Sequence, residues 1–398
     1  MQLLLNNGAD VKTQGGEYGN ALQAASLNGR LEVVQLLLNN GADVKAQGGS
    51  YGNALQAASL NGRLEVMQLL LNNGADVKAQ GGSYGNALQA ASLDGRLEVV
   101  QLLLNNGADV KTQGGSYGNA LQAASLNGPL EVVQLLLNNG ADVNAQGGEY
   151  GNTLQAASFN GRLEVVQLLL DEGADINAQG GICGNALLAA SDQGHINIIK
   201  LLFRFSRLHT TETDDLGRTA LFWASRNGHL PVVQYLLSIR RFDPDTKNYY
   251  GSTALSAAIA NGHCEIAELL IASSASTQEQ FHVGRSLLWW AFRVGNPQII
   301  RLISQHAESC EAVPQKGDLS ADAVFDATSA WCDACTLSIS DSSVSYSCQE
   351  CLGFCLCSDC YKRGFRCRGQ AHALTTSLDG NSGISYFEIY SRSQGTDY

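Results

Sequence analysis

Residues 21–53 read ALQAASLNGRLEVVQLLLNNGADVKAQGGSYGN, and this stretch recurs almost letter for letter at a period of 33 residues. The leucine of its A-L-Q-A-A segment marks each copy. It falls at Leu22, Leu55, Leu88, Leu121, Leu154, Leu187, Leu221, Leu255 and Leu288. A fixed period of this length indicates a solenoid, in which each unit stacks on the next. The chain therefore holds nine copies, preceded by a partial one.

Each copy predicts two short helices, over residues 21–27 and 31–39 in the first full copy. Gly29 and Gly41 follow these helices and suit a left-handed C-cap. The second helix is apolar around most of its circumference, so it needs cover on more than one side. Because helices this short are marginal alone, neighbouring units must share one continuous core. We therefore expect an all-α repeat solenoid.

The pattern N-A-L-Q-A-A-x-x-x-G-x-L-x-V-V-x-x-L-L-x-x-G-A-D resembles the ankyrin repeat over residues 1–308. The resemblance implies a stack of helix-turn-helix units that binds other proteins. Asn20 stands where many ankyrin repeats carry threonine, and its side chain can cap the first helix equally well. Thr219 and Thr253 restore the usual residue, although the last four copies, from Ile182 onward, are irregular.

Composition narrows the classes of partner. The 398 residues are 44% hydrophobic and only 16% charged, and no apolar run reaches the ~18 residues of a membrane span. Residues 1–180 hold 8 basic and 16 acidic side chains within a net charge of −12. Such a surface repels phosphate backbones. We expect protein or peptide partners, with no nucleic acid, membrane or small-molecule substrate.

The first residues, MQLLLNNGAD, match the second half of a repeat and lack the basic region and cleavage site of a signal peptide. We therefore expect an intracellular location, in the cytoplasm or nucleus, and a chain that begins inside a repeat. Fungal-type receptors place a NACHT-like nucleotide-binding module before similar arrays. This suggests an alternative, the C-terminal sensor portion of a NACHT-type signalling ATPase. A second alternative is a substrate adaptor for a ubiquitin ligase.

The first five copies differ at few positions, notably where Pro129 replaces an arginine. Such uniformity indicates either display of one chemistry at regular steps or a spacer. The loops also carry tyrosines in register, with Cys183 at the next such position. These are Tyr18, Tyr51, Tyr84, Tyr117 and Tyr150. They either grip a peptide or pack each ring against its neighbour.

Three histidines each follow a glycine at the start of a second helix, namely His195, His229 and His263. The repeat already explains their positions, which indicates a role in the scaffold. No acid, base and nucleophile set can be assembled from residues whose positions the repeat already explains. We expect no enzymatic activity.

Eight of the eleven cysteines fall within residues 332–367. The spacing is Cys332-x2-Cys335-x12-Cys348-x2-Cys351-x5-Cys357-x2-Cys360-x6-Cys367-x4-His372. Thiolates paired two residues apart bind tetrahedral Zn²⁺, and this set supplies two closed sites. Disulfides are the alternative in a secreted protein, but no secretion signal is present. The sequence therefore predicts two zinc ions.

Trp331-Cys332-Asp333, Tyr346, Phe354-x-Leu356 and Cys360-Tyr361-x-x-Gly364 resemble the ZZ-type zinc finger. The resemblance implies a small cross-brace with interleaved ligands. Cys332, Cys335, Cys357 and Cys360 would hold one zinc, and Cys348, Cys351, Cys367 and His372 the other. The family usually ends in two histidines, so either Cys367 or Cys355 completes the second site. A RING finger, the alternative, would require a last Cys-x2-Cys pair that is absent.

ZZ fingers that bind a partner's N-terminus do so through acidic residues around the first zinc site. Asp333 matches one of them, while Gly353 and Cys355 replace two others, which leaves Glu350 to compensate. The alternative is a purely structural finger. The predicted organisation is an ankyrin array (1–308), a linker (309–328), a ZZ-type module (329–374) and a tail (375–398). The predicted function is a non-catalytic protein-interaction scaffold.

Overall fold

The computed structural model describes residues 1–277 and 286–306 and, further along, residues 332, 345–348, 355–357, 361 and 374–376. The chain divides into two compact units, Met1–Gly181 and Ile182–Tyr398, and each is considered by itself. The predicted linker, residues 309–328, lies outside the described residues.

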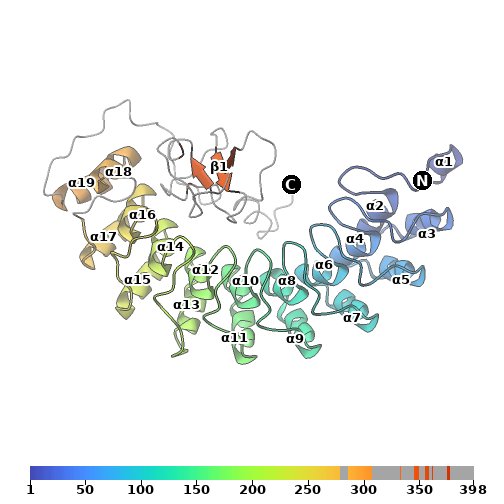
Figure 1. Cartoon of the computed structure of the whole chain (residues 1–398), viewed down its shortest axis with the longest axis horizontal. Helices are drawn as coiled ribbons and strands as arrows, with labels where there is room; N and C mark the ends of the chain where they lie inside the picture. The colour runs from blue at the N-terminus through green and yellow to red at the C-terminus, as the bar shows by residue number, and fades with distance from the viewer. Residues whose placement is uncertain are drawn as a thin grey trace. The chain divides into compact units, whose positions relative to one another are not determined.

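The first unit is a succession of helix pairs (Figure 1). It begins with α1 (Gln2–Asn6). The first helices of the pairs are α2 (Ala21–Leu27), α4 (Ala54–Leu60), α6 (Ala87–Leu93), α8 (Ala120–Asn127) and α10 (Thr153–Phe159). The second helices are α3 (Leu31–Asn39), α5 (Leu64–Asn72), α7 (Leu97–Asn105), α9 (Leu130–Asn138) and α11 (Leu163–Asp171). The predicted helices at 21–27 and 31–39 are confirmed.

Each first helix packs against the first helix of the next copy and against its own second helix. The alanines of A-L-Q-A-A make this close approach possible, since Ala57 and Ala58 are completely buried. Leu55 and the second-helix residues Met67 and Leu70 are also buried. The core is thus continuous from copy to copy, as the apolar second helices predict.

A buried glutamine ties the first helix of each of these copies to the loop that leads into the next copy, a contact that the repeat pattern alone does not reveal. Nε2 of Gln56 donates to the carbonyl oxygens of Gly81 and Gly85, at 3.1 and 3.0 Å. Gln23, Gln89 and Gln122 make the same pair of bonds in their own copies. The helix that carries Gln56 is capped by Asn53, whose Oδ1 accepts from the Gln56 amide at 2.9 Å.

The close fit of this glutamine predicts a strong effect of Gly52→Ala. Gly52 has a φ of +77°, and a Cβ added there would lie 1.9 Å from Oε1 of Gln56. Gly74 has a φ of +86° with nothing within 4 Å of its added Cβ, so Gly74→Ala measures backbone strain alone. Displacing Gln56 adds an overpacking cost of about 1–3 kcal/mol. We expect Gly52→Ala to lower the urea unfolding midpoint clearly more than Gly74→Ala; equal shifts would contradict the steric argument.

The second unit continues the helix pairs and adds a small sheet. Its first helices are α12 (Ala186–Asp192), α14 (Ala220–Arg226), α16 (Ala254–Ala260) and α18 (Leu287–Val294). Its second helices are α13 (Ile196–Leu202), α15 (Leu230–Ile239), α17 (Cys264–Ala272) and α19 (Pro297–His306). The first helices again pack in chain order. No helix in the described part of the chain combines the length and apolarity needed to cross a membrane.

The sheet consists of β1 (Ser345–Cys348), β2 (Cys355–Cys357) and β3 (Leu374–Thr376). β1 and β2 lie in the predicted zinc module, and β3 extends two residues past the module's predicted end at residue 374. All pairings are antiparallel, in the order β2-β1-β3. Tyr346 stands opposite Leu356 on one side and Thr376 on the other. Leu356 is completely buried, and the rings of Tyr346 and Tyr361 stack with centroids 3.7 Å apart. These side chains give the sheet a small apolar centre.

Candidate interaction surfaces and metal centre

The tyrosines of the first unit form a stacked ladder. Ring centroids lie 5.9 Å apart between Tyr18 and Tyr51, 6.2 Å between Tyr51 and Tyr84, and 6.3 Å between Tyr84 and Tyr117, with planes within 17°. The interpretation that each ring packs against its neighbour is confirmed for these four. Tyr150 departs from the ladder and packs against Phe159, which replaces the leucine of earlier copies, at 5.2 Å.

In five copies the residue before the second helix bridges to the preceding copy. Nε of Arg63 donates to the carbonyl oxygen of Leu27 at 3.2 Å. Histidines take over this role in the second unit, where Nε2 of His229 lies 2.7 Å from the Asp192 carbonyl oxygen. Nε2 of His263 lies 2.9 Å from the corresponding oxygen of Arg226. The scaffold role is confirmed for these two histidines, and His195 occupies the same place before α13.

His263 should make the second unit sensitive to acid. Burial lowers the pKa of His263 below its ordinary value of about 6.5, and the hydrogen bond to Arg226 opposes this only in part. The unfolded chain then binds the proton more readily, so stability is complete above pH ~6.5 and declines as the pH falls below it.

Arginine at position 263 would keep the carbonyl contact, as Arg63 does, without titrating in this range. We expect the thermal midpoint to fall less between pH 7.5 and 5.5 in His263→Arg than in the wild type. Identical pH profiles would contradict the assignment.

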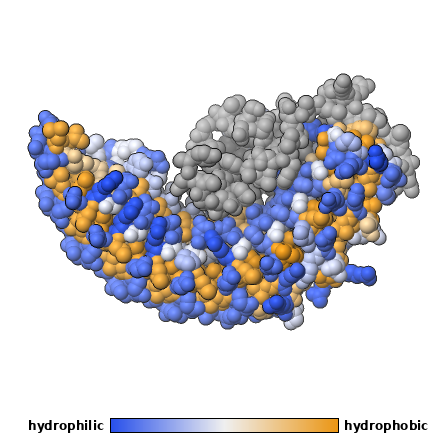
Figure 2. All heavy atoms as spheres, turned by 180° about the vertical axis from the view of Figure 1, so that it is seen from behind, coloured by the Kyte–Doolittle hydropathy of each residue, from blue (hydrophilic) through white to orange (hydrophobic). Residues whose placement is uncertain are grey.

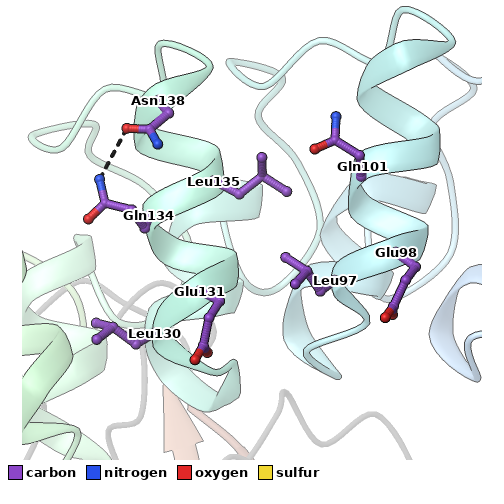
Figure 3. Close-up of a pocket in the computed structure, with 8 residues that line it drawn as sticks. All are labelled: Leu97, Glu98, Gln101, Leu130, Glu131, Gln134, Leu135 and Asn138. Atoms are coloured by element: carbon purple, nitrogen blue, oxygen red, sulfur yellow. Dashed lines mark hydrogen bonds between the residues drawn. The ribbon is translucent and has the colours of Figure 1, made fainter.

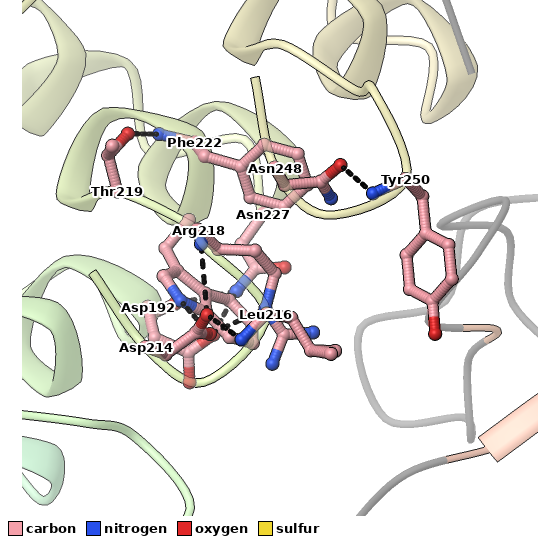
Figure 4. A network of polar contacts seen from close by, with 10 residues as sticks. Asp192, Asp214, Leu216, Arg218, Thr219, Phe222, Asn227, Asn248 and Tyr250 are labelled. Atoms are coloured by element: carbon pink, nitrogen blue, oxygen red, sulfur yellow. Dashed lines mark hydrogen bonds and ion pairs between the residues drawn. The ribbon is translucent and has the colours of Figure 1, made fainter. Parts of the chain in front are cut away.

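A buried polar network organises one loop of the second unit (Figure 4). Oδ1 of Asp214 accepts from the amides of Leu216 and Arg218, at 3.0 and 2.9 Å. Oδ2 accepts from Nε of Arg218 at 2.5 Å and from Nε1 of Trp223 at 3.2 Å. The Arg218 guanidinium lies over the Trp223 ring, 4.4 Å from its centroid. All three side chains are buried, so this network belongs to the scaffold.

Two other conspicuous residues of the second unit, Trp290 and Cys183, are buried. Trp290 aligns with the first alanine of A-A, and its neighbour Trp289 is half-buried. Burial raises the pKa of the Cys183 thiol well above its usual range, and the carboxylates of Asp192 and Asp214 raise it further. This thiol therefore stays protonated and is a poor nucleophile.

A groove lies between two neighbouring second helices of the first unit, α7 and α9 (Figure 3). It has a volume of about 760 Å³. Its apolar lining is Leu97, Leu130 and Leu135, and Leu97 and Leu130 are 37% and 39% exposed. Glu98 and Glu131 line the same groove. It is an apolar surface with a negative border.

The structure places only part of the predicted zinc site. Cys332 is completely buried, Cys348 ends β1 and Cys357 ends β2. Cys357 stands opposite Ser345 and Cys348 opposite Leu374, so the two cysteines are three positions apart along β1. The remaining ligands and both peptide-binding candidates lie outside the described residues: Cys335, Cys351, Cys360, Cys367, His372, Asp333 and Glu350. Among the described residues, no three metal-ligating side chains cluster.

The family comparison decides what the helix pairs are. A family model described as ankyrin repeats (3 copies) matches residues 1–81, 87–180, 153–248 and 233–314, well over half of the chain. The chain belongs to the ankyrin-repeat family. Its array is a protein-protein interaction scaffold, as is general for these repeats. The same scan detects no ZZ-type finger and no NACHT module, and a search of the curated proteins finds no match.

Proposed function

We propose that this ankyrin-repeat protein is a non-catalytic scaffold that carries a ZZ-type zinc module at residues 329–374. The module binds the N-terminal amine of a partner protein. The observation that carries the proposal is the spacing of seven cysteines and one histidine along residues 332–372. The ankyrin array supplies the protein-interaction context in which such a module works.

The residues present suit two zinc ions. Thiolate and imidazole ligands are those that structural zinc prefers. Cys348 and Cys357 end the paired strands β1 and β2, and the ZZ pattern assigns them to different zinc ions. A segment of ~45 residues with so small an apolar centre also needs a metal to stay folded.

Zinc would give the module a negative centre. Four thiolates around one Zn²⁺ carry a formal charge of −2, to which the Asp333 carboxylate adds. A local negative potential attracts an ammonium group. Because Gly353 and Cys355 stand where the family often has carboxylates, we expect a Kd of ~100 μM to 1 mM, or about −5.5 to −4 kcal/mol.

Titration of the full chain with peptides that carry either a free or an acetylated N-terminus tests this proposal. Tighter binding of the free amine, lost in Asp333→Ala and retained in the control Asp341→Ala, supports it. Equal binding of both peptides, or unchanged binding in Asp333→Ala, would leave the module as a purely structural finger.

A further inference from the structure

One copy of the first unit differs from the others in the residue that precedes its second helix. An arginine precedes the second helix in four of the first five copies, namely Arg30, Arg63, Arg96 and Arg162, whereas Pro129 precedes α9. Arg162 donates to the Leu126 carbonyl oxygen at 3.2 Å, as Arg63 does to Leu27. Proline has no side-chain donor and no charge. The start of α9 therefore lacks the cation that the equivalent helices carry.

The groove between α7 and α9 begins at this step. Glu98 and Glu131 line it, and no basic side chain does (Figure 3). The nearest arginine on the α7 side, Arg96, forms an ion pair with Asp94 at 2.5 Å. Within the part of the chain that the structure describes, neither Glu98 nor Glu131 has an ion-pair partner. Glu131 therefore lacks the arginine that stands two residues before the equivalent glutamates, Glu98 among them.

The lining of the groove is apolar and partly exposed. Exposed leucines recur at the start of the second helices as Leu31, Leu64, Leu97 and Leu130. On the face in Figure 2, apolar residues are interspersed with polar ones. At the α7 and α9 step, Leu135 joins Leu97 and Leu130 in lining one groove. Gln134 and Asn138 also line the groove, and Nε2 of Gln134 donates to Oδ1 of Asn138 at 3.1 Å.

We propose that this groove binds a basic amphipathic helix of a partner protein. Leucine-like side chains of the partner cover Leu97, Leu130 and Leu135, and its lysines or arginines reach Glu98 and Glu131. The occupant follows from charge complementarity, since the groove lacks its own cations. A second helix of another copy of this chain is a poor occupant, because it carries a glutamate at the same place as Glu131. This docking is independent of the zinc module.

The test uses the full chain and a labelled peptide of leucine and lysine, about 14 residues long, with leucine at helical spacing. Fluorescence anisotropy gives its Kd. We expect Pro129→Arg to weaken binding about threefold, because it adds a positive charge two residues before Glu131 and so reduces the attraction of the groove for a basic peptide. Since arginine is the natural residue in four other copies, this variant should fold, and its helical circular dichroism checks that.

Matched double variants distinguish binding in the groove from general electrostatic attraction of a basic peptide to an acidic protein. Glu98→Gln with Glu131→Gln should weaken binding about tenfold, whereas Glu32→Gln with Glu65→Gln, which removes the same charge elsewhere, should leave Kd unchanged. Leu130→Ser should weaken binding and Leu31→Ser should not. Equal weakening by both double variants, or no binding to the wild type, would overturn the proposal. The ankyrin scaffold and the zinc module would be unaffected by that result.

Discussion

The full chain is expected to bind two zinc ions, and a chelator that removes them should unfold residues 329–374 while the ankyrin helices stay folded. Structural zinc contributes on the order of 10–16 kcal/mol of apparent binding free energy in small finger peptides. That exceeds the total stability of a domain of ~45 residues. The helices of both units have their own continuous core, so their circular dichroism should persist after chelation.

Metal analysis of the purified chain measures this directly, with Cys332→Ser as the test variant and Cys264→Ser as the control. Cys332 is a predicted ligand of the first zinc and is buried, whereas Cys264 lies on α17 outside the module. The first substitution should lower the zinc content and the second should not. A wild-type chain that folds with less than one zinc ion would contradict the assignment.

The helices of the array could be predicted from sequence because every cue to them is local. Asn20 and Gly29 mark the ends of a helix within a few residues, and both act as predicted: Asn20 caps α2, and Gly29 has a φ of +67°. The stacking of Tyr18 on Tyr51 could also be predicted, because identical loops repeat in register. Because the sequence is periodic, a local feature predicted in one copy is expected in every similar copy of the unit.

Contacts between residues distant in the sequence were harder to predict. Gln56 reads as an ordinary polar helix residue, yet it is buried because its partners lie 25 and 29 residues further along the chain. Its recurrence in the first five copies was the available signal. The groove at Pro129 escaped prediction for a different reason. The substitution is visible in the sequence, but its effect depends on the space between α7 and α9 and on the pairing of Arg96 with Asp94.

For the candidate zinc site, too, the local features could be predicted from the sequence and the distant contacts could not. Ligand spacing is local, so the sequence names the cysteines and the histidine directly. The structure adds the antiparallel register of β1 and β2, which relates Cys348 to Cys357 through the backbone. Which residues share one ion, and whether Cys367 or Cys355 completes the second site, stay predictions that the metal analysis of single variants would test.

Asp214→Ala is expected to destabilise the second unit by about 3–5 kcal/mol. The side chain of Asp214 is only 3% exposed, and it balances the buried guanidinium of Arg218. Removing one member of a buried pair leaves the other charge uncompensated, which costs about this much. The Trp223 indole also loses its acceptor. Asp215→Ala, at the exposed neighbouring carboxylate, is the matched control and should change stability by less than about 0.5 kcal/mol.

Asp214→Asn separates the charge from the loop geometry. In the following copy Asn248 holds the equivalent loop in the same way. Its Oδ1 accepts hydrogen bonds from the amides of Tyr250 and Ser252 at 3.0 and 2.8 Å. Asparagine at position 214 should therefore keep the loop but lose the counter-charge, which places its stability between those of the wild type and Asp214→Ala. All four tryptophans lie after Gly181, so tryptophan fluorescence during thermal unfolding reports on the second unit. Equal midpoints for Asp214→Ala and Asp215→Ala would show that the buried pair does not stabilise this unit.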